Sequence, residues 1–280
     1  MTTCYINGTY QDISKSKVSI TDRGFQFSDG VYEVIAVYEN KFVDMELHLK
    51  RLMTSLNKLK IRINLKLNQI ENISKKIKRL NNFNNGIIYI QITRGNQHPR
   101  DHKYPNGLKP NIIIYSIPKD FKKINSNAKR GVSTSLYPDI RWLRSDIKSI
   151  SLLGNSMAAN YAKEKKNHEA ILYDEKNYIT EGNSSSIWII KNNKCITHPL
   201  NYRILKGCTR HKLISIVKKK KLKFEEKKFS VKALLSADEV FMTSATNFIM
   251  PIVKIDKKKI SKGKPGPISL ALRKKYISAI

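Results

Sequence analysis

The chain has 280 residues, of which 40% are hydrophobic and 27% are charged, and its formal net charge is +31. This length allows one large domain or two smaller ones, and the composition is typical of a globular protein rather than a disordered one. No apolar run approaches the length of a membrane-spanning helix, and the N-terminal residues lack the basic and apolar regions of a secretion signal. We therefore expect a cytoplasmic protein with no membrane partner.

The high positive charge raises the possibility of a nucleic-acid-binding protein. Lysine is nevertheless spread along the whole chain, and the densest runs, at residues 218–221 and 257–259, are expected to form a helix end and a turn. We favour a solvated surface and expect no specific nucleic-acid partner. The three cysteines are far apart and the histidines show no HExxH spacing, so neither a disulfide framework nor a metal site is expected.

The first part of the chain is predicted to combine strands with amphipathic helices. A hairpin with an Asn-Gly turn is expected over residues 4–10. Asp44 can cap a helix with an apolar stripe formed by Met45, Leu49, Leu52, Leu56 and Leu59. A second helix has the apolar positions Ile70, Ile73, Ile77 and Leu80. The other strands are expected at residues 31–38, 41–43, 87–93 and 112–116.

Residues 118–131 are polar and lack periodicity, which indicates a linker. We expect a first domain at 1–120, a linker at 121–131 and a second, cofactor-binding domain at 132–280. In the second domain, strands are expected at 132–136, 170–173, 178–180, 187–190, 194–197, 239–243 and 252–255. Helices are expected at about 156–166, after Thr209 and from about Pro267. The predicted fold class is α+β or α/β, with two domains of mixed sheets and packed helices.

Two segments carry residues suited to covalent chemistry. Lys148 lies between apolar residues and beside small hydroxyl residues, shortly before a predicted helix. Partial burial of a lysine lowers its pKa and makes the amine nucleophilic. Residues 180–186 place Glu181 and several small hydrogen-bond donors where a strand is expected to end. A Schiff-base lysine and a carboxylate facing a pyridine nitrogen are what pyridoxal phosphate chemistry requires.

Several motifs occur in the order found in a known family. They cover residues 22–34, 46–52, 141–149, 180–182, 204–210 and 241–244. With these motifs the chain resembles the class IV pyridoxal-phosphate aminotransferases of fold type IV, and most closely their D-amino acid (D-alanine) aminotransferase branch. The resemblance implies that Lys148 holds pyridoxal 5′-phosphate as an internal aldimine and moves a proton during transfer of the amino group. It also implies that Glu181 pairs with the pyridine nitrogen and keeps it protonated.

The same resemblance implies contacts to the phosphate of the cofactor. Arg51 is similar to the arginine of the family that contacts the phosphate, and a guanidinium suits this dianion through paired hydrogen bonds. Cys208 and Thr209 stand at a predicted helix start, where backbone N–H groups are available to an anion. Ser244 and Ala245 fall on a second loop of phosphate and substrate contacts, where Ala245 replaces a threonine that is common in the family.

A basic loop indicates the branch of the family. In D-amino acid aminotransferases a Pro-Arg-x-His segment from the neighbouring subunit binds the substrate α-carboxylate together with a tyrosine. Arg100, His102 and Tyr32 match this pattern, which implies a homodimer acting on D-amino acids and 2-oxo acids. The segment carries one extra residue around Gln97 and His98, which leaves its geometry open. From the residues alone, Arg51 could be a surface arginine, Tyr32 a core tyrosine and the loop an ordinary basic surface loop.

Two other activities of the same fold remain as alternatives, a branched-chain L-amino acid aminotransferase and an aminodeoxychorismate lyase. Both would also have the lysine and the glutamate, but the Arg100 and His102 loop argues against both. A basic nucleic-acid-binding protein is the non-enzymatic alternative, and its binding would fall steeply with salt and would not depend on Lys148.

Overall fold

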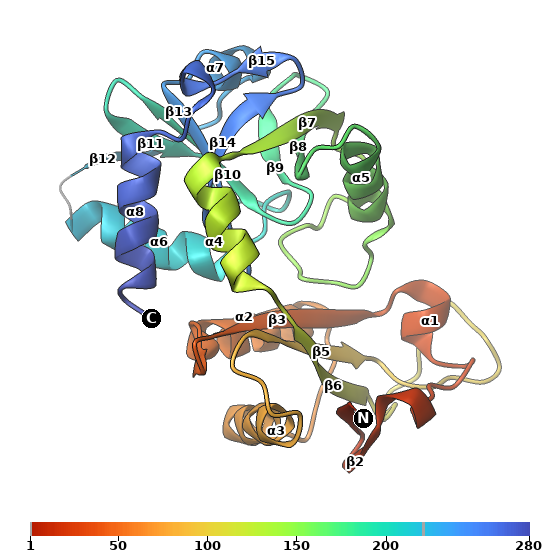
Figure 1. The fold of residues 1–280 in the computed structure, drawn as a ribbon. Coiled ribbons are helices and arrows are strands. Elements are labelled where there is room, and N and C mark those ends of the chain that lie inside the picture. The colour runs from red at the N-terminus through yellow and green to blue at the C-terminus, as the bar shows by residue number, and fades with distance from the viewer. Residues whose placement is uncertain (1, 220–221) are drawn as a thin grey trace. The chain divides into compact units, whose positions relative to one another are not determined.

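The computed structural model describes residues 2–219 and 222–280, which form two compact units (Figure 1). Unit 1 contains the chain up to Asp120 together with a short returning segment, Ile147–Ser151. Unit 2 contains Phe121–Asp146 and Leu152–Ile280. Within the described residues, no helix combines the length and apolar character needed to span a membrane. The expected fold class, two domains of sheets with packed helices, is confirmed, although only the sheet of unit 2 is mixed and that of unit 1 is antiparallel throughout.

Unit 1 is built on a six-stranded sheet with the order β2-β1-β6-β5-β3-β4, in which all neighbours are antiparallel. The strands are β1 (Thr3–Ile6), β2 (Thr9–Asp12), β3 (Gly30–Tyr38), β4 (Lys41–Phe42), β5 (Gly86–Thr93) and β6 (Asn111–Pro118). The expected hairpin joins β1 to β2, with Asn7 and Gly8 at φ values of 50° and 106°. Positive φ at both positions suits the right-handed twist of the strands, which explains the Asn-Gly turn.

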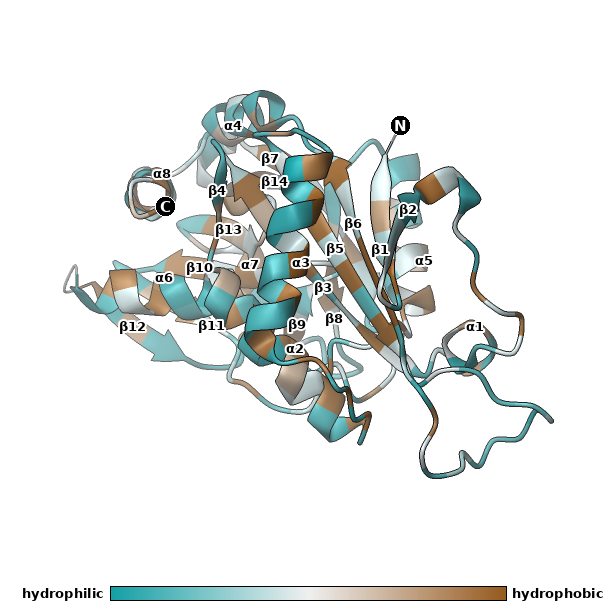
Figure 2. Ribbon diagram, turned by 90° about the horizontal axis from the view of Figure 1, so that it is seen from below, coloured by the Kyte–Doolittle hydropathy of each residue, from teal (hydrophilic) through white to brown (hydrophobic). Residues whose placement is uncertain are grey.

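Three helices accompany this sheet, namely α1 (Arg23–Phe27), α2 (Met45–Lys58) and α3 (Leu67–Leu80). Figure 2 shows α3 running along the sheet, with hydrophobic colour on the strands and hydrophilic colour on the outer side of the helix. The predicted stripe residues Leu49, Leu52 and Leu56 are buried in the core. Asp44 is the N-cap residue of α2, but its side chain makes no capping hydrogen bond because its backbone is left-handed, with φ 51°. The expected capping role of Asp44 was therefore wrong.

Unit 2 has a mixed nine-stranded sheet with the order β12-β11-β10-β13-β14-β7-β8-β9, and β15 pairs with β14. The strands are β7 (Val132–Pro138), β8 (Glu169–Tyr173), β9 (Ile179–Gly182), β10 (Ser186–Lys191), β11 (Lys194–Thr197), β12 (Lys223–Glu226), β13 (Glu239–Ser244), β14 (Phe248–Ile255) and β15 (Lys258–Lys259). The β14–β7, β7–β8 and β11–β12 pairs are parallel, and the others are antiparallel. Each of the seven strands expected in this region is present, and β12 and β15 were not predicted.

The helices of unit 2 are α4 (Phe121–Arg130), α5 (Leu153–Glu164), α6 (Cys208–Lys219), α7 (Val231–Leu235) and α8 (Pro267–Ile277). Helix α5 packs on β7 and β8, whereas α4 packs on β14 and α8 on both β13 and β14. Large buried aromatic side chains fill the core, and Trp188 stacks on Phe241 with ring centroids 5.7 Å apart. Helix α5 begins three residues before the expected position, at Leu153 instead of Ser156. Lys220 and Lys221 of the predicted helix end lie outside the described residues.

The segment expected to be a linker is a helix. Residues 121–130 form α4 and belong to unit 2, with Phe121, Ile124 and Ala128 buried. These positions are spaced i, i+3 and i+7, so they line one face of the helix and cover the sheet. Phe121 stacks on Phe248 of β14 with ring centroids 5.4 Å apart. The polar residues between them face outward, which hid the pattern in the sequence.

If α4 contributes to the core, replacing Phe121 by alanine should destabilise the protein strongly. The expected loss is about 3–5 kcal/mol, the usual cost of removing a buried aromatic side chain. The exposed neighbour Lys122 is the control, and Lys122→Ala should change stability by less than about 0.5 kcal/mol. Urea unfolding measures both changes. Equal midpoints for the two variants would show that the segment behaves as a linker after all.

Candidate active site

Lys148 is attached to the start of β3 in unit 1. Its carbonyl accepts a hydrogen bond from Tyr32 N at 3.0 Å, and its own N–H donates to Ser55 Oγ at 3.2 Å. The neighbouring residues extend this pairing, since Ser149 bridges to Val31 in antiparallel fashion. Ile147 is buried in the core of unit 1, which anchors the segment on the other side of the lysine. The backbone of Lys148 is thus fixed on both sides, while its side chain is only half-buried.

The side chain of Lys148 lies over an aromatic ring. Its Nζ is 4.0 Å from the centroid of the Tyr32 ring, which attracts a cation through its π face. Tyr32 in turn stacks on Tyr89 with ring centroids 5.8 Å apart. The ring centroids of Tyr89 and Tyr115 are 5.0 Å apart. Burial is the main cause that raises the pKa of Tyr89, and the neighbouring tyrosines add to this effect. The structure therefore brings together two of the predicted residues, Lys148 and Tyr32, beside the rings of Tyr89 and Tyr115.

Arg51 is held by a buried carboxylate to which the sequence had assigned no role. Its Nε and Nη2 donate to the two oxygens of Glu33 at 2.9 and 2.6 Å. Glu33 is fully buried, and His48 Nδ1 lies 2.9 Å from its Oε1. Burial raises the pKa of Glu33, but Arg51 and His48 outweigh it, so the pKa lies below its usual range. Both partners were part of motifs noted in the sequence, yet only the fold shows that Arg51 is oriented by two-point pairing.

Glu181 lies in β9 of unit 2 and is also buried. Its Oε1 accepts a hydrogen bond from Arg141 Nη1, and its Oε2 accepts one from the N–H of Leu205 at 3.2 Å. Burial raises the pKa of Glu181, and the positive charge of Arg141 opposes this effect without cancelling it. The Glu181 carboxylate therefore does not face water. A buried carboxylate that is paired with one guanidinium can still accept a hydrogen bond from a second donor.

Arg141 was also overlooked as a functional residue, although it belongs to the motif around Lys148. Besides Glu181 it pairs with Asp139, with its Nε 2.8 Å from Oδ1 and its Nη2 2.8 Å from Oδ2. Thr180, next to Glu181 in the chain, donates to Asp139 Oδ2 at 2.7 Å. Asp139 therefore fixes the guanidinium plane, which in turn fixes the orientation of the Glu181 carboxylate.

The predicted phosphate contacts of unit 2 lie next to one another. Helix α6 begins at Cys208, so the N–H groups of its first turn lack the helical acceptors that later residues have. A Cβ atom at Gly207 would lie 3.2 Å from Ser186 Oγ, and the glycine thus permits this close approach. Ser186 is paired in register with Thr243, the residue before Ser244. Through Ser186, the start of α6 and the end of β13 come together.

The start of α6 and the end of β13 provide different hydrogen-bond donors for an anion. Cys208 and Thr209 are buried, so the helix start is shielded from solvent. Ser244 Oγ accepts a hydrogen bond from Asn247 N at 3.2 Å, which orders the turn that contains Ala245. The Ser244 hydroxyl keeps its own proton for donation to an anion. Helix dipole, backbone N–H groups and a hydroxyl are the usual elements of a phosphate site.

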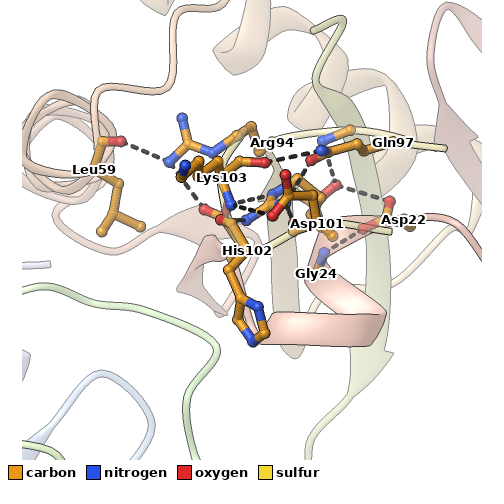
Figure 3. Close-up of polar contacts among 12 residues, drawn as sticks. Asp22, Gly24, Leu59, Arg94, Gln97, Asp101, His102 and Lys103 are labelled. Atoms are coloured by element: carbon orange, nitrogen blue, oxygen red, sulfur yellow. Dashed lines mark hydrogen bonds and ion pairs between the residues drawn. The ribbon is translucent and has the colours of Figure 1, made fainter. Parts of the chain in front are cut away.

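Arg100 and His102 are exposed on the loop between β5 and β6 of unit 1. Both pack on Phe27 of α1, with the guanidinium carbon of Arg100 4.3 Å from the ring centroid. The His102 ring lies 5.2 Å from the same ring, measured between centroids. One aromatic side chain therefore brings the two predicted carboxylate ligands together. Figure 3 shows polar contacts of the same loop, with Gln97, His102 and Lys103 labelled. Tyr32, the third predicted ligand, makes its contacts in the cluster around Lys148.

This chain is similar to known proteins over nearly its whole length. The profile of the family "Amino-transferase class IV" matches residues 30–255. The D-alanine aminotransferase of Staphylococcus haemolyticus is 36% identical, covering 100% of this chain and 99% of the relative. That of Bacillus licheniformis is 38% identical, covering 94% of this chain and 92% of the relative. The chain belongs to the class IV aminotransferases.

Solved structures show the same fold. The branched-chain amino acid aminotransferase of Escherichia coli has a TM-score of 0.91 at 20% identity, covering 99% of this chain and 93% of that chain. A hypothetical aminotransferase from Mycobacterium tuberculosis, solved in a PLP-bound form, has a TM-score of 0.86 at 19% identity, covering 99% of this chain and 98% of that chain. These likenesses confirm the fold.

The pairing of Glu33 with Arg51 predicts a pH-dependent stability. The depressed pKa of Glu33 adds stability at pH values above its unfolded pKa, and this contribution is lost as the pH falls toward the folded pKa. Glu33→Gln should therefore cost about 3–5 kcal/mol near pH 7, because it leaves Arg51 without its buried partner. The difference in free energy of unfolding between this variant and the wild type should become smaller below about pH 4, where a free glutamate becomes protonated. Urea unfolding between about pH 7 and about pH 3.5 checks this, and a gap that stays constant would contradict it.

Proposed function

We propose that this aminotransferase transfers the amino group of a D-amino acid, such as D-alanine, to a 2-oxo acid with pyridoxal 5′-phosphate as cofactor. The observation that carries the choice of substrate is the presentation of Arg100 and His102 on one ring, Phe27. A guanidinium and an imidazole that converge from one loop suit an α-carboxylate through charge-assisted hydrogen bonds. The full-length similarity to D-alanine aminotransferases supports the same substrate class.

The residues present fit the cofactor. We assign Lys148 to its aldehyde, Glu181 to its pyridine nitrogen, and Arg51 together with Cys208, Thr209, Ser244 and Ala245 to its phosphate. When bound, pyridoxal phosphate supplies an aldehyde that reacts with amines and a ring that withdraws electrons from the substrate α-carbon. Ala245 offers no side-chain donor, so its contribution is limited to the backbone N–H. Arg51 is oriented for such a contact by Glu33, and the helix start at Cys208 is buried and close-packed.

Different residues of the chain carry out proton transfer, contact with the ring nitrogen and binding of the substrate carboxylate. Lys148 Nζ is the amine that takes the proton from the substrate α-carbon, and the Tyr32 ring keeps this amine in place. Glu181 would accept a hydrogen bond from a protonated ring nitrogen, and the positive charge of Arg141 opposes the effect of burial on the pKa of this glutamate. Arg100 and His102 bind the α-carboxylate and thereby set which face of the α-carbon meets the base.

We further propose that the protein acts as a cytoplasmic homodimer. Arg100 and His102 are exposed in the single chain and belong to the loop cluster on Phe27, whereas Tyr32 belongs to the cluster around Lys148. A loop that binds the carboxylate in the partner subunit's site accounts for this arrangement. Size-exclusion chromatography with light scattering measures the dimer directly.

A substrate panel tests the proposed activity. Purified protein supplied with pyridoxal phosphate should turn over D-alanine with a 2-oxo acid acceptor, and D-glutamate is a second candidate donor. Turnover of L-leucine without D-alanine would establish the branched-chain alternative, and cleavage of aminodeoxychorismate without amino transfer would establish the lyase. A protein that binds no cofactor but binds nucleic acid with a steep dependence on salt would support the non-enzymatic alternative.

Two buried glutamates of unit 2 allow a matched test of Glu181. Both Glu181 and Glu169 are buried, and burial raises the pKa of each. Glu169 accepts hydrogen bonds from Ser185 Oγ at 2.7 Å and Ser184 N at 2.9 Å, and an amide oxygen can replace it there. Glu181→Gln should lower kcat by about 100-fold, since a neutral amide cannot stabilise a protonated pyridine nitrogen. Glu169→Gln should keep most of the activity, and an equal loss in both variants would argue against the assigned role.

A further inference from the structure

Gln97 connects the start of the loop that carries Arg100 and His102 with Lys103, the residue after His102. Its Oε1 accepts a hydrogen bond from Arg23 Nη1 at 2.5 Å, and its Nε2 donates to the carbonyl of Lys103 at 2.9 Å (Figure 3). Its own backbone N–H donates to the carbonyl of Thr21 at 3.0 Å, which fixes the residue at the start of the loop. The Gln97 side chain therefore connects the beginning of the loop with the residue that follows His102.

Arg23, the partner of Gln97, is a buried anchor. Its Nε pairs with Asp29 Oδ2 at 2.9 Å, and only 3% of the residue is exposed. The guanidinium also donates to the carbonyls of Asp101 at 2.6 Å and His102 at 3.0 Å. Arg23 thus binds the backbone at His102 itself, and Gln97 supplies a further acceptor that completes this arrangement.

The same anchor is linked to the ring on which the loop side chains rest. The guanidinium carbon of Arg23 lies 4.6 Å from the centroid of Phe27, and Arg100 and His102 pack on this ring as well. Arg100 and His102 are exposed, so burial does not hold them in place. Exposed loops are generally more mobile than the elements they connect, and each residue that must be ordered on binding weakens affinity.

We propose that Gln97 is a positioning residue for recognition of the substrate carboxylate, because it holds the loop in the conformation that presents Arg100 and His102. This inference rests on the proposed D-amino acid transaminase function. It also changes the interpretation of the extra residue near Gln97 and His98. In the sequence the extra residue left the loop geometry open, whereas in the structure Gln97 binds Lys103 within the loop and Arg23 outside it.

Kinetics of the variant Gln97→Met test the proposal. Methionine has a similar size but offers neither hydrogen bond. In the cofactor-loaded enzyme, we expect KM for D-alanine to rise about tenfold with little change in kcat, as for a lost contact that acts on binding. The affinity for pyridoxal phosphate should stay unchanged. The control is His98→Ala, which removes an exposed side chain from the same loop and should leave KM as it is.

Limited trypsin digestion of the loaded enzyme provides a second measurement that needs no activity. The carbonyl of Lys103 that Gln97 binds belongs to the peptide bond that trypsin cleaves, so Gln97→Met should be cut there faster than wild type and His98→Ala should not. A KM equal to that of wild type, or a raised KM without faster cleavage, would overturn the proposal. If the wild type does not turn over D-alanine, the proposed function fails and the carboxylate role with it. Faster cleavage would then still show that Gln97 orders the loop.

Discussion

The backbone pairing between the segment Ile147–Ser151 and the start of β3 is the constraint on which the candidate site depends. Tyr32 N donates to the Lys148 carbonyl at 3.0 Å, and Ile150 N donates to the Gly30 carbonyl at 3.1 Å. Because these bonds lie on either side of Ser149, they fix the direction of the chain at the lysine. The Lys148 amine is therefore held over the Tyr32 ring, although the flanking stretches of chain belong to unit 2.

Paired buried charges orient the other groups of the site. Arg51 is fixed by Glu33, Glu181 is fixed by Arg141, and Asp29 binds both Arg23 and Arg94. Burying ions costs free energy, and such pairs are weak evidence for stability. Their value here is geometric, because a planar guanidinium with two contacts leaves little freedom to either partner. Each pair holds one of the elements assigned to phosphate, to ring nitrogen or to substrate carboxylate.

Much of the fold followed from local patterns, and the remainder depended on contacts between distant residues. The stripes around Leu52 and Ile77 predicted α2 and α3, because helix burial is periodic in sequence. Helix α4 was missed because its three buried residues are separated by lysine and asparagine. The motifs named Lys148 and Glu181, but the role of Arg141 depends on a carboxylate 40 positions away. Likewise, the extra residue near Gln97 and His98 left the loop geometry open in the sequence, and the partners of Gln97, Arg23 and Lys103, are known only from the fold.

Covalent trapping of the cofactor tests the central claim, that the Lys148 amine is the reacting nucleophile, most directly. Reduction of the cofactor-loaded protein with borohydride should leave the pyridoxyl group on the peptide that contains Lys148, as identified by mass spectrometry. Lys165, which also lies near a tyrosine ring at 4.9 Å from the Tyr161 centroid, provides an internal comparison. A label on Lys148 alone is the predicted result. A label on Lys165 or spread over many lysines would contradict the account.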